Sequence, residues 1–410
     1  MRPVLLSAIV LLARGADAQP VSATAEARLE ESSLLAKLAA DPRLTRTAAE
    51  VDLARAEVVA AGIAAAPSLA YEREAVRSGE GFASDALRLT VPLEISGRRA
   101  ARRAAASHEV TAMSAEADAS RFALTLAALR SFRVAQYERE RSELLQAERA
   151  ALAAAVDVVR KRAAAGDTSG YDLQRIELEL TSYDDSLRAG LLALDAARME
   201  LGTWVGQPAG IDAAGALTVP PDPTALEAVL GGALEHRPEL RAAAARSEGA
   251  KALLRAADRA WIPELSLSAG ILRQDASADD SSWGYLAGVS LSLPIFDHGQ
   301  AERARASAQH QRAEATKQIL ARTIPAALRV RYAALVRAVE RARAVEQQQL
   351  PRLPQLLRSA EAAYRDGGGN IVELVDAYAT ARDLRLRALE LRRDAHLAQL
   401  EFWLVLGRRP

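Results

Sequence analysis

The sequence of 410 residues contains no cysteine. Disulfide bonds are therefore excluded, and so is a lipid attached to an N-terminal cysteine. Aromatic residues make up only 4% of the chain, and abundant Ala, Leu, Arg and Glu indicate long packed helices instead of bulky globular cores. Because Lys plus Arg and Asp plus Glu are 53 each, the formal net charge is zero and favours no nucleic-acid partner.

Motifs for catalysis or metal binding are also missing. No two histidines stand at the helical spacing of a metal-binding pair. The histidines are His108, His236, His298, His310 and His396. No nucleophile motif and no phosphate-binding loop occurs. We therefore expect a chain that is not an enzyme and that has no cofactor and no metal site.

The first 18 residues predict a secretory signal peptide. Arg2 precedes an apolar run over residues 4–13, and the small-residue pattern at 16–18 resembles a cleavage site. The alternative is an apolar start to a helix, which Pro3 and Gly15 disfavour. No later apolar run reaches the roughly 18 residues that a spanning helix needs, so crossing a membrane would require strands.

Two junctions between a strand and a long helix organise the chain. Apolar residues alternate with polar ones before the first junction, at Leu87, Leu89, Val91 and Leu93. From Gly97 to Ala165 there is no proline, which predicts a helix of about 100 Å. The pattern returns over residues 285–300. A basic cluster follows the first strand, and we interpret it as a solvated helix face, with contact to anionic lipid as the alternative: Arg98, Arg99, Arg102 and Arg103.

The chain is internally duplicated. Matching residues lie 196 to 202 positions apart, as in Pro42 with Pro238, Gly97 with Gly299 and Gly166 with Gly367. We predict a signal peptide at 1–18, a first structural repeat at 19–206, a Pro/Gly-rich linker at 207–224 and a second repeat at 225–410. Each repeat contains a helix, two strands, and a long helix that turns back at a Gly-rich turn into a coiled hairpin. Pro351 and Pro354 should interrupt the second long helix.

Each repeat supplies two predicted strands, over residues 68–76 and 87–93 and over 264–272 and 285–295. Four strands cannot close a barrel, and backbone groups in lipid must all be paired, so several chains would pool about 8 or 12 strands. We expect Leu89, Val91, Val289 and Leu291 to face lipid. The alternative is a soluble hairpin packed on helices, which Arg73 and Glu74 in the first strand mildly support.

The sequence resembles the TolC-type outer-membrane efflux factors over nearly all of the mature chain. The resemblance rests on PSLAYERE from Pro67, TVPLEISGRRAARRAAAS from Thr90, WIPELSLSAG from Trp261, LSLPIFDHGQAERARAS from Leu291, and LPRLPQLLRSAEAAYRDGGGNIVELVDA from Leu350. PLEISGRR resembles the cation-efflux branch. The resemblance implies a mainly α fold with a small membrane β part. It also implies a homotrimer whose 12-stranded transmembrane β-barrel lies in outer-membrane lipid and continues into a long periplasmic α-helical barrel.

The resemblance also implies a function: a passive exit duct, docked to a periplasmic adaptor (membrane fusion) protein and an inner-membrane efflux pump. The cargo would be metal cations or small toxic compounds. The alternative is a periplasmic coiled-coil scaffold or adaptor with no pore. The Gly-rich tips should dock the adaptor, at Gly166, Ser169, Gly170, Gly367, Gly369 and Asn370.

An acidic pair follows the second tip. Glu373 and Asp376, three residues apart, share one helix face, and a trimer would repeat that face around its axis to form a cation-attracting constriction. The alternative is a solvated helix face. The resemblance further implies that contacts of Tyr364 and Asp172 help to hold the gate closed. The family's basic partner corresponds to Gly369 in this chain.

Overall fold

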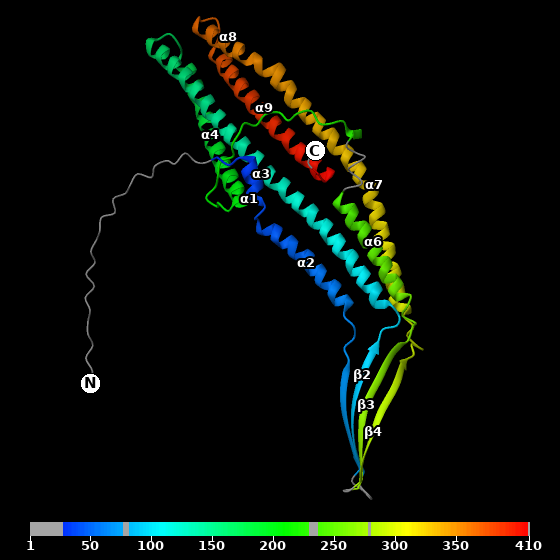
Figure 1. Ribbon diagram of the computed structural model, residues 1–410. Helices are drawn as coiled ribbons and strands as arrows, with labels where there is room; N and C mark the ends of the chain where they lie inside the picture. The colour runs from blue at the N-terminus through cyan, green and yellow to red at the C-terminus, as the bar shows by residue number, and fades with distance from the viewer. Residues whose placement is uncertain (1–27, 77–81, 229–236, 278–279, 409–410) are drawn as a thin grey trace, which may run out of the picture.

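The computed structural model describes residues 28–76, 82–228, 237–277 and 280–408, so the predicted signal peptide lies outside the described residues. The molecule is elongated, with an antiparallel sheet at one end and two helical tips at the other (Figure 1). The elements in chain order are α1 (Glu31–Leu38), α2 (Pro42–Gly62), β1 (Ser68–Val76), β2 (Phe82–Leu93), α3 (Arg98–Ala165), α4 (Gly170–Val205), α6 (Pro238–Ala257), β3 (Glu264–Ser277), β4 (Asp280–Ser292), α7 (Gln300–Ala344), α8 (Leu353–Arg365) and α9 (Ile371–Leu406).

The sheet has the strand order β1-β2-β3-β4, and every neighbouring pair is antiparallel. The predicted first strand is confirmed, but the second begins at Phe82 and not at Leu87, because its earlier residues pair with the far half of β1. β4 ends at Ser292, so the prediction that Ile295 belongs to it was wrong. Pro294, which follows, has no amide proton to extend the ladder.

Glycines in the left-handed region connect the strands to the long helices. Gly97 has φ of 70° before α3 and Gly299 has φ of 84° before α7, a conformation that L side chains rarely adopt. The predicted break near Pro351 is confirmed, because a π-helical turn (Val345–Gln349) and a 3₁₀ turn (Leu350–Arg352) separate α7 from α8. The long α3, with 68 residues, continues to the tip without such a break.

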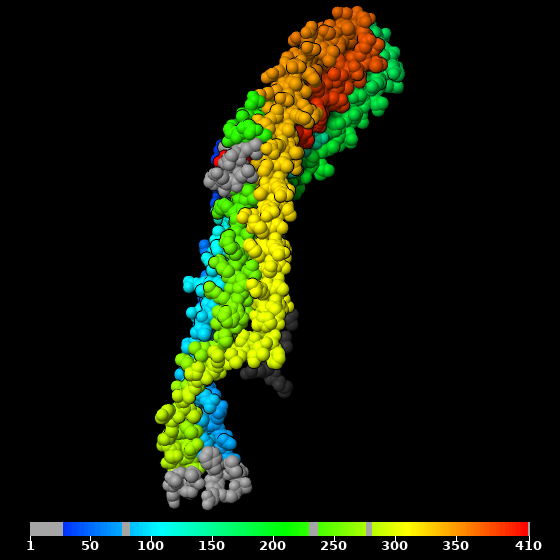
Figure 2. Space-filling model, turned by 90° about the vertical axis from the view of Figure 1, so that its right-hand side faces the viewer, coloured from blue at the N-terminus to red at the C-terminus, as the bar shows by residue number. Residues whose placement is uncertain are grey.

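The helices pack side by side along the length of the molecule. Near the sheet α2 lies against α3, α3 against α6, and α6 against α7, which runs along one side of the molecule (Figures 1 and 2). Towards the tips α3 pairs with α4 and α8 with α9. The buried residues of the tip half come from both pairs and include Leu152, Val156 and Ile176 with Leu374 and Val375.

The two edges of this layer of strands and helices have no further strand or helix beside them within the described residues. β1 and α2 form one side, and β4 and α7 the other. Each edge helix nevertheless carries an exposed stripe of small and apolar residues at alternating spacings of four and three, which is the pattern of a coiled-coil seam. The stripes are Ala49, Leu53, Ala56 and Ala60 on α2, and Ile319, Thr323, Ala326 and Val330 on α7. Leu53 is 69% exposed and Val330 67%.

Candidate functional site

The two faces of the sheet differ in chemistry. The pairing places apolar residues in register on one face, in rows such as Tyr71–Leu87–Ile271–Tyr285 and Val91–Leu267–Val289. The four residues predicted to face lipid, Leu89, Val91, Val289 and Leu291, all lie on this face. The opposite face is mostly polar or small, as in the row Ser68–Thr90–Ser268–Gly288, with Leu272 and Leu286 as apolar exceptions.

The apolar face is exposed. Val289 is 72% exposed and Tyr285 86%. Its apolar rows extend from Tyr285 to Leu291 of β4, six residue steps or about 20 Å at 3.3 Å per residue, against the roughly 25 Å band of outer-membrane strands. The next row is charged on three strands, Arg73–Asp85–Arg273, and ends at Trp283. Aromatic side chains lie at both ends of this band: Trp283 is exposed towards the end far from the helices, and Trp261 and Phe296 are exposed where the sheet joins the helices.

The tips lie at the end of the molecule far from the sheet (Figure 1). Gly166 with φ of 79° ends α3, and Gly367 with φ of 78° follows α8. Both have open space where a side chain would be, as has Gly170 at the start of α4. Ser169 caps α4 by accepting a hydrogen bond from the Asp172 amide at 3.2 Å. The predicted docking tips are therefore tight turns whose backbone is accessible.

The predicted acidic pair lies on the exposed side of the first turns of α9. Asn370 and Glu373 form a reciprocal cap, in which the Glu373 amide donates to Asn370 Oδ1 at 2.9 Å. The Glu373 carboxylate accepts from the Asn370 amide at 3.4 Å, and it also lies favourably near the positive end of the helix dipole. Asp376 is exposed and has no ion pair among the described residues.

The structure brings the two predicted gate residues together through a third residue. Thr168 Oγ1 donates to Asp172 Oδ2 at 2.6 Å and lies 3.2 Å from the hydroxyl of Tyr364. Tyr364 is 7% exposed and belongs to α8, whereas Thr168 and Asp172 belong to the tip of the α3/α4 pair. The contact therefore connects the helix pairs of the two repeats.

Sequence reasoning missed Arg162, which also holds Tyr364. Its Nη1 donates to the backbone carbonyl of Tyr364 at 2.8 Å, and its guanidinium lies 5.2 Å from the centre of the Tyr364 ring. That carbonyl is in the last turn of α8, where helix carbonyls lack partners and a positive charge is favourable. We call Arg162, Thr168, Asp172 and Tyr364 the tip clasp.

Gly369, at the position of the family's basic residue, leaves little room for a side chain. A Cβ there would lie 3.0 Å from the Cβ of Ala363 and 3.2 Å from the Glu373 carboxylate. In this chain the positive charge next to Tyr364 comes from the other helix pair. The sequence carried no signal for Arg162, since basic residues are common in the last turn of any helix.

Below the clasp, polar groups cross the buried interface between the two helix pairs. Arg385 of α9 forms an ion pair with Glu148 of α3, which is 3% exposed. The Arg382 guanidinium lies 4.3 Å from the ring centre of Tyr183. Burial raises the pKa of the Tyr183 phenol to about 12, and burial also raises the pKa of Tyr378. Both phenols are therefore neutral at physiological pH.

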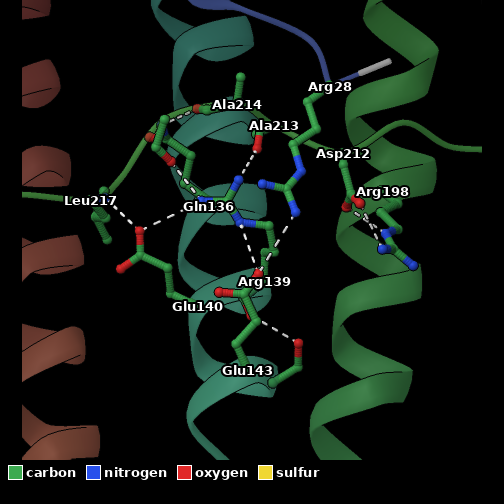
Figure 3. Close-up of polar contacts among 12 residues, drawn as sticks. Arg28, Gln136, Arg139, Glu140, Glu143, Arg198, Asp212, Ala213, Ala214 and Leu217 are labelled. Carbon is green, nitrogen blue, oxygen red and sulfur yellow. Dashed lines mark hydrogen bonds and ion pairs between the residues drawn. The ribbon is translucent and has the colours of Figure 1, made fainter. Parts of the chain in front are cut away.

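The predicted Pro/Gly-rich linker is fixed against α3 midway along the molecule (Figure 3). Arg139, 7% exposed, donates from Nη1 to the Ala213 carbonyl at 2.5 Å and from Nη2 to the Gly215 carbonyl at 2.6 Å. Glu140 accepts a hydrogen bond from the Leu217 amide at 2.6 Å. A buried guanidinium and a partly buried carboxylate thus satisfy the backbone of a segment that has no regular structure of its own.

Within the described ranges, no helix combines the length and apolarity needed to span a bilayer. No three His, Asp or Glu side chains of the described residues lie close enough together to hold a metal ion.

Comparisons with known proteins found similarity both in sequence and in fold. Residues 229–408 match the model of the family described as outer membrane efflux protein. The cobalt-zinc-cadmium resistance protein CzcC of Cupriavidus metallidurans is 25% identical over 382 residues, which are 92% of this chain and 90% of CzcC. A Pseudomonas aeruginosa membrane protein superposes with a TM-score of 0.79 at 20% identity, covering 93% of both chains. VceC of Vibrio cholerae superposes with 0.77 at 19% identity, covering 92% of this chain and 96% of VceC.

Proposed function

We propose that this chain is an outer membrane efflux protein of the TolC type and the passive exit duct of a tripartite efflux system, because residues 229–408 match that family's model and the chain is similar to CzcC over 92% of its length. The protein belongs to the outer membrane, with a helical part in the periplasm. The observation that carries the proposal is the sheet, whose one face is exposed and apolar over about 20 Å of strand while its other face is mostly polar or small. A duct needs both faces, whereas a soluble scaffold needs neither.

The duct is a homotrimer. One chain leaves β1 and β4 unpaired, and in lipid these edges must be satisfied by another copy. The exposed seams on α2 and α7 lie on the same two sides as β1 and β4, so one head-to-tail contact covers both the strands and the helices. Such a contact closes into a ring. Three copies supply 12 strands for a transmembrane β-barrel, which the helices continue as a periplasmic α-helical barrel.

The two repeats, 19–206 and 225–410 with the linker 207–224 between them, each contribute one helix pair to this barrel. The tips of these pairs receive a periplasmic adaptor protein, which connects the duct to an inner-membrane pump. This role is supported by the open space where a side chain would lie at Gly166, Gly170 and Gly367. A helical hairpin can approach such bare backbone closely. The duct itself does no chemistry, and it belongs to a family of channels and not of enzymes.

The gate lies at the tips. In a trimer Glu373 and Asp376 contribute two carboxylates from each chain, six in all, to a constriction that attracts cations. The tip clasp holds α8 of each chain against its α3/α4 pair and so keeps this constriction narrow. The cargo is metal cations or small toxic compounds. Cations are supported by the similarity to a cobalt-zinc-cadmium resistance protein and by the acidic pair.

Membrane assembly tests the proposal. Val289→Arg places a charge on the apolar face about 3 Å from the middle of the band, and it should cost about 2 kcal/mol or more and reduce assembly. Ser290→Arg places the same charge on the polar face of the same strand, and it should assemble normally. The measurement is the amount of trimer that only detergent extracts from outer membranes. Equal assembly of the two variants, or a wild-type protein that is a soluble monomer, would contradict the duct and favour the scaffold.

A further inference from the structure

A basic groove lies at the end of the helical part that is nearest the sheet, between the end of α2 and the start of α3. It has a volume of about 510 Å³ and is lined by Gly62, Arg99, Ala100, Arg103, Ala104 and Ser107. Arg99 follows Leu93, the last residue of β2, by only six positions. The groove is therefore next to the end of the apolar band.

Two of the four arginines in the sequence cluster lack a partner. Arg98 forms an ion pair with Glu302 at 2.7 Å, and Arg102 with Glu94 at 3.3 Å. Arg99 and Arg103 are exposed, and among the described residues neither guanidinium has an ion pair or a hydrogen bond. The aliphatic part of Arg103 lies against Gly62, where an added Cβ would meet its Cδ at 3.6 Å. These two charges are available to an anion.

The groove lies on a different face from the concave side of the helix layer. That concave side holds a larger cavity of about 870 Å³ lined by α2, α3, α6 and α7, to which α3 contributes Arg102, Glu109 and Glu116. At about 100° per residue, the α3 residues that line the groove are on average about 150° around the helix from the α3 residues that line this cavity. In a closed ring the concave side faces the axis, so the groove faces away from the duct.

Apolar side chains flank the groove. Ile63, directly after α2, is 66% exposed, and Ile95, directly after β2, is 58% exposed. A ligand that combines an anionic head with apolar chains satisfies both features of this surface. Small anions in solution satisfy only the first.

We propose that this groove binds the headgroup of an anionic phospholipid in the leaflet that faces the periplasm. The proposal rests on the membrane location proposed above. The forked guanidinium groups of Arg99 and Arg103 bind the phosphate oxygens, and the hydroxyl of Ser107 donates to the same group. The acyl chains lie along Ile63 and Ile95 towards the apolar band. Anionic lipid is preferred over zwitterionic lipid because neither guanidinium forms an ion pair among the described residues, and the nearby Glu94 carboxylate accepts from the Arg99 backbone amide and pairs with Arg102.

Native mass spectrometry of the full-length trimer in detergent tests this, with phosphatidylglycerol and phosphatidylcholine as probes. We expect wild type to bind phosphatidylglycerol more tightly. Arg99→Gln with Arg103→Gln should weaken this binding by roughly 30-fold, at about 1 kcal/mol for each arginine. The matched control, Arg121→Gln with Arg130→Gln, removes two exposed arginines of the same helix that lie about 30 to 40 Å further from the sheet, and it should change nothing.

Three results would overturn the proposal: equal binding of the two lipids, full retention of phosphatidylglycerol by the Arg99/Arg103 variant, or displacement of the lipid by millimolar inorganic phosphate. The same preparations report on the proposed duct separately. A trimer that needs detergent and yet shows no lipid preference leaves the duct standing and removes the lipid site. A chain that leaves the membrane without detergent contradicts the duct itself.

Discussion

Removing the Arg162 charge should loosen the gate. Arg162→Met keeps most of the aliphatic stem but loses the hydrogen bond to the Tyr364 carbonyl and the contact with its ring. A hydrogen bond to a charged group contributes about 1.5 to 3 kcal/mol, and a partly exposed cation over a ring about 0.5 to 1 kcal/mol. Because Arg162 is half-buried, we take about 2 kcal/mol for the pair of contacts.

That loss should appear as a shift between closed and open gates. About 2 kcal/mol corresponds to a roughly 30-fold change in the equilibrium, so the open probability at rest should rise by up to that factor. Tyr364→Phe removes only the hydroxyl near Thr168, a neutral hydrogen bond of about 1 kcal/mol, and should give roughly a fivefold rise. Planar-bilayer recordings of single trimers measure both.

Arg160→Met is the matched control. Arg160 lies two residues away and pairs with Asp157 and Glu177, both within the α3/α4 pair, so it does not connect the two repeats. It should leave the resting open probability unchanged. If Arg162→Met and Arg160→Met behave alike, the clasp does not hold the gate and the reasoning is refuted.

Three further predictions follow from the tips and the linker. A cysteine at Asp167, placed in the first tip because Ser169 and Asn370 are needed as helix caps, should crosslink to the adaptor, and a cysteine at Arg273 in the sheet should not. Glu373→Gln with Asp376→Asn keeps a capping residue at 373, and in planar bilayers it should lower both the preference for cations and the block by multivalent cations. The control, Glu390→Gln with Asp394→Asn, lies about 26 Å along the same helix and should change neither. Burial, aided by the charge of Arg133, lowers the pKa of His396 below its usual 6.5. The neutral imidazole therefore stabilises the folded protein fully above pH 6.5, and this stabilisation is lost as the pH falls through the pKa of the folded state. His396→Gln should therefore reduce the loss of melting temperature between pH 7 and pH 5, and an unchanged loss would contradict this account.

Local chemistry made much of the fold predictable. The alternation of apolar residues indicates the cores of β2 and β4, the proline-free run indicates α3, and Gly166 and Gly367 indicate the turns. These features depend on side-chain period and backbone freedom, which each residue carries with it. For the same reason the shared face of the strand residues and the acidic pair on α9 could be read without coordinates. Their roles in a membrane and a pore remain predictions.

The strand ends and the clasp required the tertiary structure. β2 begins at Phe82 because β1 and β3 are there to pair with it, although the apolar alternation starts later. Arg162 meets Tyr364 across 202 residues of sequence, and nothing local distinguishes it from other arginines in the last turn of a helix. The absence of room at Gly369 likewise depends on Ala363. Such contacts form only when distant segments pack.

The linker shows the same division between sequence and structure. Its prolines and glycines determined that residues 207–224 form no long helix or strand, because proline lacks an amide donor and glycine favours turns. That the segment is nonetheless held in one place was decided by Arg139 and Glu140, which are buried against its backbone. Sequence alone determined the local conformations of this protein. Which side chains meet between the two repeats was decided by tertiary packing, because a contact's partner depends on where both segments lie in space.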